Sequence, residues 1–418
     1  MKKVVIVGQG YVGLPLAMRA VEAGYRVVGY DTSATRIKQL AAADSYVEDV
    51  PSDQVRAALE SGRYLPSFDA GDCAGFDVAV ITVPTPLSEG VPDLSYIEQA
   101  ANDLAPLLSR GSCVVLESTT YPGTTEELVV PILERGSGLA AGADFHAGYS
   151  PERVDPGNKQ FSLGNTPKVV SGIDAESLAV VEGFYGRLVE RTVPVASTRQ
   201  AELVKLIENT FRHVNIALVN ELAMFAGDLG VDIWGALDAA ETKPFGFMRF
   251  NPGPGVGGHC LPVDPSYLAW QVKRRVGETF RFVELANDVN NHMPAYVVRR
   301  LTRAFNQREQ SIRGRRLLLL GLSYKPNTGD ARESPALEIA EQLVALGADV
   351  RAVDPHVEAD QVGHSIELAE LTVEEVQAAD GVVVLTHHDA LDLDLVAEHA
   401  SYVLDTRRCV TGPQVEYL

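Results

Sequence analysis

A glycine motif near the N-terminus limits the possible folds of this chain more than any other feature. Residues 8–13 read Gly-Gln-Gly-Tyr-Val-Gly; they directly follow an apolar segment and open a helix-like stretch over residues 13–23. A second apolar segment ends at Asp31. Glycines at this spacing allow a tight turn and bring backbone amides close to a pyrophosphate, and the acid binds ribose hydroxyls. The motif therefore predicts a βαβ unit that binds a dinucleotide.

The residue at position 31 predicts which dinucleotide is bound. A carboxylate at the end of the second strand repels a 2'-phosphate, so Asp31 favours NAD over NADP. Arg36 is close in the sequence and leaves NADP open. From this segment we expect the following residues to contact the cofactor: Gly8, Gly10, Tyr11, Val12, Gly13, Asp31 and Arg36.

Strand-like segments recur in both halves of the chain, with helical stretches between them. They cover residues 77–83, 113–118 and 168–172 in the first half, and 317–320, 349–353, 381–385 and 402–404 in the second. This alternation is typical of doubly wound parallel sheets. Across residues 198–230, apolar positions recur every three or four residues without a proline, which predicts a long helix. That helix is either a spine between domains, with a possible dimer contact, or a buried core helix.

These patterns predict an α/β protein in which two doubly wound Rossmann-like domains are joined by a long central helix and a helical middle domain. A length of 418 residues fits two or three domains. We expect them at residues 1–198, 199–306 and 311–418.

Composition excludes several classes of protein. With 46% hydrophobic residues but only short apolar runs, the chain is expected to be globular and cytoplasmic, without a membrane helix or a leader. A net charge of -20 opposes nucleic-acid binding and requires local basic groups for any anionic substrate. The four cysteines are widely spaced, so neither a metal site nor a disulfide framework is expected. We expect Cys73 and Cys113 to be packing residues, and no partner is evident for Cys409.

A glycine-rich loop surrounds the remaining cysteine. Residues 253–264 read Gly-Pro-Gly-Val-Gly-Gly-His-Cys-Leu-Pro-Val-Asp. Small neighbours admit a substrate and backbone amides stabilise a thiolate, so Cys260 is a candidate nucleophile. A buried packing role is equally compatible with the residues alone. His259 is adjacent, and since neighbouring side chains in an extended segment point apart, we expect it to shape the loop rather than act as the base.

Two further groups of polar residues are candidates for chemistry. Lys205 and Asn209 lie one turn apart on the predicted long helix, where they would either stabilise an oxyanion or form a solvated polar stripe. Glu152 lies in a polar, proline-broken loop, residues 149–157, just after the predicted sheet. It would serve either as a base for water or as the cap of a turn.

Together these segments resemble the UDP-glucose/UDP-mannuronate-type nucleotide-sugar 6-dehydrogenases, over nearly the whole chain. The resemblance includes the glycine motif, Val-Pro-Thr-Pro at residues 83–86, Glu-Ser-Thr at 117–119, Ser-Pro-Glu-Arg at 150–153 and Gly-Gly-His-Cys at 257–260. It also includes Lys205 to Asn209 and Gly-Leu-Ser-Tyr-Lys-Pro at 321–326. The middle domain would then mediate dimerisation and the C-terminal domain would bind the nucleotide sugar.

The resemblance implies a four-electron oxidation of the sugar C6 alcohol to the acid, with NAD as acceptor. Cys260 would form a thiohemiacetal and then a thioester, which water hydrolyses. Lys205 and Asn209 would stabilise the C6 oxygen, Asp264 with Thr119 would organise a water or proton relay, and Glu152 would assist proton removal or hydrolysis. The resemblance adds these residues to the cofactor site: Pro84, Thr85, Thr119, Glu152 and Arg332.

The same resemblance supplies a set of substrate contacts. Lys325 and Arg332 match a basic loop of the second α/β domain, Arg407 matches the end of its last strand, and Arg249 would reach the substrate, possibly across a dimer interface. The residues expected to bind substrate are Glu152, Arg153, Lys205, Asn209, Arg212, Arg249, Phe250, Asn251, Gly253, Gly257, Lys325 and Arg407.

The sugar is identified less specifically than the reaction. Residues 259–264 and 243–248 are similar to the branch acting on UDP-N-acetylhexosamines, and within it to UDP-N-acetylglucosamine enzymes of polysaccharide biosynthesis; UDP-glucose and dTDP-glucose remain alternatives. An epimerase is excluded because no tyrosine has a lysine four residues later. The Gly-Gly-His-Cys loop and the large second α/β domain argue against a two-electron hydroxyacid dehydrogenase. A non-catalytic NAD-binding sensor would not need Lys205, Cys260 and Asp264 together. We expect a homodimer through the central helix.

Overall fold

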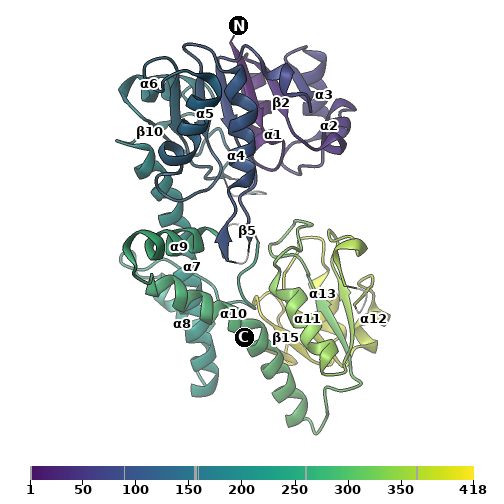
Figure 1. The fold of residues 1–418 in the computed structure, drawn as a ribbon. Helices are drawn as coiled ribbons and strands as arrows, with labels where there is room; N and C mark the ends of the chain where they lie inside the picture. The colour runs from purple at the N-terminus through teal and green to yellow at the C-terminus, as the bar shows by residue number, and fades with distance from the viewer. Residues whose placement is uncertain (1, 89, 155–157, 159, 259–260, 364–365) are drawn as a thin grey trace. The chain divides into compact units, whose positions relative to one another are not determined.

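The computed structural model describes residues 2–418 apart from 89, 155–157, 159, 259–260 and 364–365. The chain forms two compact units, the first ending at Glu208 and the second beginning at Asn209 (Figure 1). His259 and Cys260 lie outside the described residues. The predicted roles of these two residues are therefore not tested by the structure.

The first unit is built on a sheet whose central strands are buried on both faces. Its strands lie in the order β10-β9-β8-β7-β4-β1-β2-β3. In chain order they are β1 (Lys3–Val7), β2 (Arg26–Tyr30), β3 (Tyr64–Ser67), β4 (Val78–Ile81), β7 (Cys113–Leu116), β8 (His146–Tyr149), β9 (Lys168–Gly172) and β10 (Thr192–Pro194). A small hairpin pairs β5 (Leu87–Ser88) with β6 (Val91–Pro92) outside this sheet. The predicted strands are present, whereas β3, β8 and β10 were not anticipated.

One strand pair departs from the expected parallel sheet. β9 runs antiparallel to β8, with Gly148 opposite Gly172 and Tyr149 opposite Ser171. The ladders from β3 through β8 are parallel. The carboxyl end of β8 therefore lies beside the beginning of β9, and residues of β9 reach the same sheet edge as the glycine motif.

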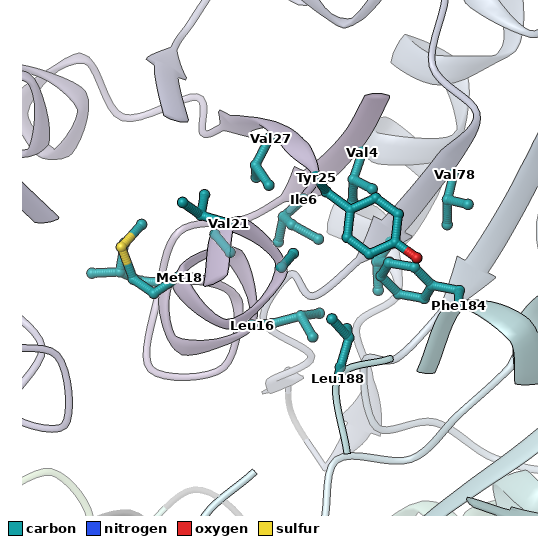
Figure 2. Close-up of a cluster of buried hydrophobic side chains, with 14 of the residues drawn as sticks. Val4, Ile6, Leu16, Met18, Val21, Tyr25, Val27, Val78, Phe184 and Leu188 are labelled. Carbon is teal, nitrogen blue, oxygen red and sulfur yellow. The ribbon is translucent and has the colours of Figure 1, made fainter. Parts of the chain in front are cut away.

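Helices cover both faces of this sheet because alternate strand residues point to opposite sides. Val4 and Ile6 of β1 belong to one apolar cluster, with side chains of α1 and α6 (Figure 2). Val5 and Val7 belong to a second cluster, which also contains Cys73, whereas Cys113 packs in the first. The helices are α1 (Gly13–Glu22), α2 (Ala34–Ala41), α3 (Ser52–Glu60), α4 (Ser95–Leu104), α5 (Val130–Ser137) and α6 (Ala175–Tyr185), with shorter turns η1 (Ala70–Cys73), η2 (Ala105–Leu107) and η3 (Thr125–Val129).

A long helix, α7 (Thr198–Leu229), follows the first sheet, as its apolar spacing predicted. It is followed by α8 (Ile233–Glu241), α9 (Asp264–Val276) and α10 (Arg281–Gln307). Pro294 lies inside α10, where it removes a backbone donor from the helical ladder.

The second unit contains another doubly wound sheet. Its strands lie in the order β13-β12-β11-β14-β15-β16, and each pair described in this sheet is parallel. They are β11 (Arg316–Leu320), β12 (Asp349–Val353), β13 (Glu367–Leu368), β14 (Gly381–Val384), β15 (Val403–Asp405) and β16 (Val415–Tyr417). The covering helices include α11 (Pro335–Ala345), α12 (Val373–Ala378) and α13 (Leu393–His399), with a short turn η4 (Ala359–Gln361). The α/β class with two Rossmann-like sheets and a helical middle is thus confirmed.

Candidate active site

The glycine motif forms the turn between β1 and α1, and each glycine has its own steric reason. Gly8 has φ +92°, and a Cβ there would lie 2.9 Å from the Thr82 carbonyl oxygen. A Cβ on Gly13 would lie 1.8 Å from the Gly8 carbonyl oxygen, so this glycine allows the helix to pack on the strand. No described atom lies within 4 Å of a Cβ built on Gly10. The open space at Gly10 is what close approach of a diphosphate to the backbone requires.

Asp31 follows β2 and is tied to this turn. Its carboxylate accepts hydrogen bonds from the backbone N–H of Gln9 at 2.9 Å and of Ser33 at 2.8 Å. Nη1 of Arg36 lies 3.6 Å from the same carboxylate. A carboxylate oxygen can accept more than one hydrogen bond, so the group can still receive ribose hydroxyls. These residues fit NAD, which would supply a hydride acceptor when bound.

The other predicted cofactor residues of the first unit lie on neighbouring loops. Tyr11 and Pro84 are exposed, while Thr85 and Thr119 are partly buried. A cavity of about 570 Å³ beside α1 is lined by Tyr11, Val12 and Glu152, among others. Arg332 belongs to the second unit and is paired with Asp330 at 2.7 Å.

Glu152 lies just after β8 and is held on both of its carboxylate oxygens. Oε1 accepts the backbone N–H of Arg153 at 2.9 Å and of Val154 at 2.6 Å. Oε2 lies 3.1 Å from the ammonium of Lys168. The main-chain oxygen of Glu152 accepts a hydrogen bond from Nζ of Lys205 at 2.6 Å. Two predicted catalytic residues, Glu152 and Lys205, are thereby in direct contact.

A buried ion network continues behind Glu152. The Lys168 ammonium also bonds Glu117, whose second oxygen accepts the Tyr185 hydroxyl. Burial raises the pKa of Glu117 to about 7 despite the nearby ammonium. Burial also opposes ionisation of Glu152, but the Lys168 charge and the Val154 amide outweigh it and lower its pKa to about 2. Glu152 is therefore an anion at neutral pH.

Arg153, a predicted substrate contact, is engaged within the first unit. Its Nη2 lies 2.7 Å from Glu208 Oε1, and its Nη1 donates to the Pro167 carbonyl at 2.6 Å. These bonds connect the loop after β8 to the start of β9 and to α7. Within the described contacts, Arg153 acts as a brace for the loop that contains Glu152.

In the second unit, Asn209 and Asp264 are brought together. Asp264 begins α9 and is 3% exposed, and its Oδ2 accepts a hydrogen bond from the side-chain amide of Asn209. Thr119, the other predicted member of this relay, belongs to the first unit. The Asn209 amide is thus oriented by a buried carboxylate, as an oxyanion donor needs to be.

The glycine-rich loop packs against Arg407 and against the loop that follows the first strand of the second sheet. A Cβ on Gly253 would lie 2.7 Å from Nη1 of Arg407, and one on Gly257 would lie 2.5 Å from the Glu333 carbonyl oxygen. Tyr324, next to Lys325, lies against Gly257 and Gly258. Burial lowers the pKa of Arg407 to about 10, and its Nε donates to the Leu385 carbonyl at 2.6 Å. Predicted substrate residues far apart in sequence therefore gather at the carboxyl edge of this sheet.

The remaining predicted substrate residues are more dispersed. Arg249 is held locally by Asp238 at 2.7 Å and Glu241 at 2.8 Å. Phe250 packs edge-on against Phe211, with ring centroids 5.7 Å apart. Arg212 and Asn251 are exposed.

Comparison with known proteins was made over the whole chain. Three domain descriptions of the UDP-glucose/GDP-mannose dehydrogenase family match: the NAD binding domain at residues 2–189, the central domain at 199–292 and the UDP binding domain at 318–412. A UDP-N-acetyl-D-glucosamine 6-dehydrogenase of Pseudomonas aeruginosa is 38% identical over 92% of this chain and 90% of that protein. The chain belongs to the UDP-glucose/GDP-mannose dehydrogenase family. It is an NAD-dependent dehydrogenase of nucleotide sugars, as the motifs implied.

Solved structures of the same family agree with the fold. A UDP-D-ManNAc dehydrogenase from Pyrococcus horikoshii has a TM-score of 0.90 at 34% identity and covers 100% of this chain and 98% of its own. A UDP-glucose dehydrogenase from Pyrobaculum islandicum has a TM-score of 0.88 at 29% identity, with coverage of 100% and 97%. The similarity therefore extends over the whole of this chain and nearly all of each solved chain.

Sequence reasoning missed several residues of this dehydrogenase. Lys168 was interpreted only as the start of a strand, although its ammonium is buried beside Glu152. Glu202, on α7, is buried and accepts the backbone N–H and the hydroxyl of Thr125 at 2.8 and 2.7 Å. His388 and Asp354, 3.1 Å apart, hold the loop on both sides of Lys325, because Asp354 accepts the amide of Leu322 and His388 accepts the amide of Asn327. Because lysine and glutamate side chains usually remain in solvent and histidine is often exposed, no local feature of the sequence marks these residues as buried partners.

Two structural features are absent from the described part of the chain, a group of metal-ligating side chains and a membrane-spanning helix. No group of three or more His, Cys, Asp or Glu side chains there could hold a metal ion. No helix among the described residues is long and apolar enough to cross a bilayer.

Proposed function

We propose that the enzyme oxidises the C6 alcohol of a UDP-N-acetylhexosamine to the uronic acid in two NAD-dependent steps. The first hydride transfer releases a proton and leaves an aldehyde, to which the Cys260 thiol adds. The second hydride transfer converts that thiohemiacetal into a thioester, and water cleaves it to the carboxylate and the free thiol. The sum consumes two NAD, one water and one alcohol.

The observation that carries this mechanism is the Asn209–Asp264 pair. Asp264 lies four residues after Cys260, so the pair is anchored at the end of the loop that contains the proposed nucleophile. A positioned amide stabilises the oxygen that becomes negative when a thiol adds to an aldehyde. Lys205, whose ammonium is held by the Glu152 carbonyl, supplies a positive charge for the same purpose.

The proposed sugar rests on the relatives. The Pseudomonas aeruginosa protein named above carries the name of a UDP-N-acetylglucosamine enzyme and matches at 38% identity. The Pyrobaculum islandicum structure, named as a UDP-glucose dehydrogenase, makes plain glucose the second candidate. The Arg407, Lys325 and glycine-loop surface would receive the diphosphate in either case.

The test counts NADH formed per sugar consumed. Purified enzyme is assayed with UDP-N-acetylglucosamine, UDP-N-acetylmannosamine, UDP-glucose and dTDP-glucose. Two NADH per molecule on an N-acetylhexosamine support the proposal, and two on glucose alone replace the sugar. One NADH would remove the thioester step, and binding of NAD without turnover of any sugar would favour the sensor. Cys260→Ser should stop before the acid while still binding NAD.

We also propose that a second copy of the chain covers one face of α7. Exposed apolar residues recur along it at helical spacing, with exposures of 47% at Phe211, 52% at Leu218, 44% at Leu222, 55% at Phe225 and 76% at Leu229. A row of this kind on one helix favours pairing with an identical helix. Light scattering should give a dimer mass, and Leu218→Glu with Phe225→Glu should give a monomer; an unchanged mass would contradict the assignment.

We also propose domain boundaries at residues 198/199 and 306/311. They are supported by the two large sheets, which lie before and after the helical segment 199–306 in the chain. We propose the cytoplasm as the site of action, because NAD and nucleotide sugars are available there.

A further inference from the structure

The reversal of β9 brings a buried lysine to the catalytic edge of the first sheet. In the antiparallel register, Gly148 lies opposite Gly172 and Tyr149 opposite Ser171. Continuing that register by three residues sets Glu152 opposite Lys168, and the structure has the two side chains 3.1 Å apart. In a parallel arrangement the first residue of β9 would lie at the other edge of the sheet. Lys168 therefore owes its position to this one reversal.

Lys168 connects the loop to the interior of the sheet. Its side chain is 3% exposed, and its ammonium bonds both Glu152 and the fully buried Glu117. Tyr185 on α6 donates to the other oxygen of Glu117. A buried ammonium with two carboxylates has little freedom, because any displacement leaves a charge unpaired in a medium that solvates it poorly. The network is a rigid anchor below the loop.

The loop above this anchor is shaped by the Glu152 carboxylate. One oxygen bonds Lys168, and the other accepts the two backbone N–H groups that follow in the chain. These bonds orient the peptide whose carbonyl accepts Nζ of Lys205 at 2.6 Å. An uninterrupted series of contacts thus runs from Glu117 through Lys168 and Glu152 to the Lys205 ammonium.

We propose that Lys168 is a positioning residue for the oxidation, and that it sets the location of the Lys205 ammonium through Glu152. Glu152 then serves as a structural anion whose main-chain oxygen holds Lys205, and its carboxylate takes no proton from substrate or water. This inference rests on the proposed function in one respect only: Lys205 must face the sugar C6 oxygen.

The test uses a variant that removes the cation and also neutralises Glu117, the deeper of its two carboxylate partners. Lys168→Met alone would leave the buried Glu117 carboxyl without its cation, so the informative variant combines Lys168→Met with Glu117→Gln. The matched control is Lys3→Met. Lys3 opens β1 as Lys168 opens β9, and its ammonium donates to the Asp72 and Ala74 carbonyls at 2.7 and 2.6 Å. Because β1 is parallel to its neighbours, Lys3 lies at the opposite sheet edge from the glycine turn.

The kinetic expectation separates positioning from binding. In the double variant kcat should fall about 10- to 100-fold, since small displacements of a catalytic group have effects of that size. The KM for NAD should stay within about twofold. Without the cation the buried Glu152 becomes easier to protonate, so a new acid limb should appear in the pH profile of kcat. Wild-type kcat and an unchanged profile would overturn the proposal.

Glu152→Gln tests the role of the carboxylate itself. A general base contributes about 10²- to 10⁴-fold, whereas an anchor replaced by a neutral acceptor should cost about tenfold or less. We expect a uniform decrease of kcat at all pH values. A loss of about 10³-fold or more, with the double variant nearly active, would show that Glu152 transfers protons and would contradict our assignment.

A measurement without turnover separates this inference from the proposed function. Amide hydrogen exchange of the segment ending at Val154 should accelerate in the double variant and stay unchanged in Lys3→Met, because the Glu152 carboxylate protects those amides. If the wild-type enzyme oxidises none of the sugars, the proposed function fails while this result still decides whether Lys168 holds the loop. Equal exchange in all three proteins would refute the anchor.

Discussion

Substitution by alanine should affect two glycines of the same motif differently: at Gly13 it should lower stability, and at Gly10 it should weaken NAD binding. For Gly13→Ala, the new Cβ would lie 1.8 Å from the Gly8 carbonyl oxygen, a backbone atom that cannot swing aside. Relief requires a shift of more than about 1 Å, and overpacking of this kind costs about 1–3 kcal/mol or more. At about 2–4 °C per kcal/mol for a unit of this size, the melting temperature should fall by roughly 2–12 °C.

Gly10→Ala should leave stability unchanged and impair cofactor binding. No described atom lies within 4 Å of the added Cβ, and surface changes of this kind stay within about 0.5 kcal/mol. The methyl group instead occupies the space that a diphosphate needs. Loss of about 1.4–3 kcal/mol of binding corresponds to a roughly 10- to 100-fold rise in Kd for NAD.

Thermal denaturation and NAD titration decide between these effects. Gly183→Ala on α6 is the control, since no described atom lies within 4 Å of its Cβ and alanine favours a helix. It should keep both the melting temperature and Kd, or raise the former slightly. A Gly10→Ala protein that binds NAD like the wild type would refute the placement of the diphosphate, and a Gly13→Ala protein of normal stability would refute the steric argument.

Three other changes test the site residues. Burial raises the pKa of Glu202 from its usual 4.5 to about 7, so the folded state holds a proton that the unfolded state has released. The free energy of unfolding therefore falls by up to about 3 kcal/mol as pH rises from 4.5 through 7. Thermal melts should show that Glu202→Gln becomes more stable relative to the wild type over that range. Asp264→Ala leaves the Asn209 amide without its carboxylate, and steady-state assays should show kcat reduced about 10²-fold with little change in the KM for NAD. Arg407→Lys removes a planar donor beside Gly253, so titration should show UDP binding weakened about tenfold and NAD affinity retained. Equal UDP affinity in the variant and the wild type would place the diphosphate elsewhere.

Side-chain contacts across the fold were less predictable than its elements. The long helix was evident from its spacing, and α7 extends as expected over Thr198–Leu229. The antiparallel β8–β9 pair was not evident, because an apolar strand has the same composition in either direction. The same limit applies to Lys168 and to the His388–Asp354 pair, whose partners lie far away in the chain.

The sequence by itself determined the local requirements of this dehydrogenase: a glycine turn, an acid after the second strand, a proline-free amphipathic helix and a cysteine in a glycine-rich loop. Each depends on neighbours within a few residues, so spacing and side-chain type suffice to predict it. Only the tertiary structure decided that Glu152 is held as an anion by Lys168 and that its carbonyl holds Lys205. Those relations depend on strand direction and on burial, and both are set when distant segments pack together and exclude the water that would otherwise solvate the charges.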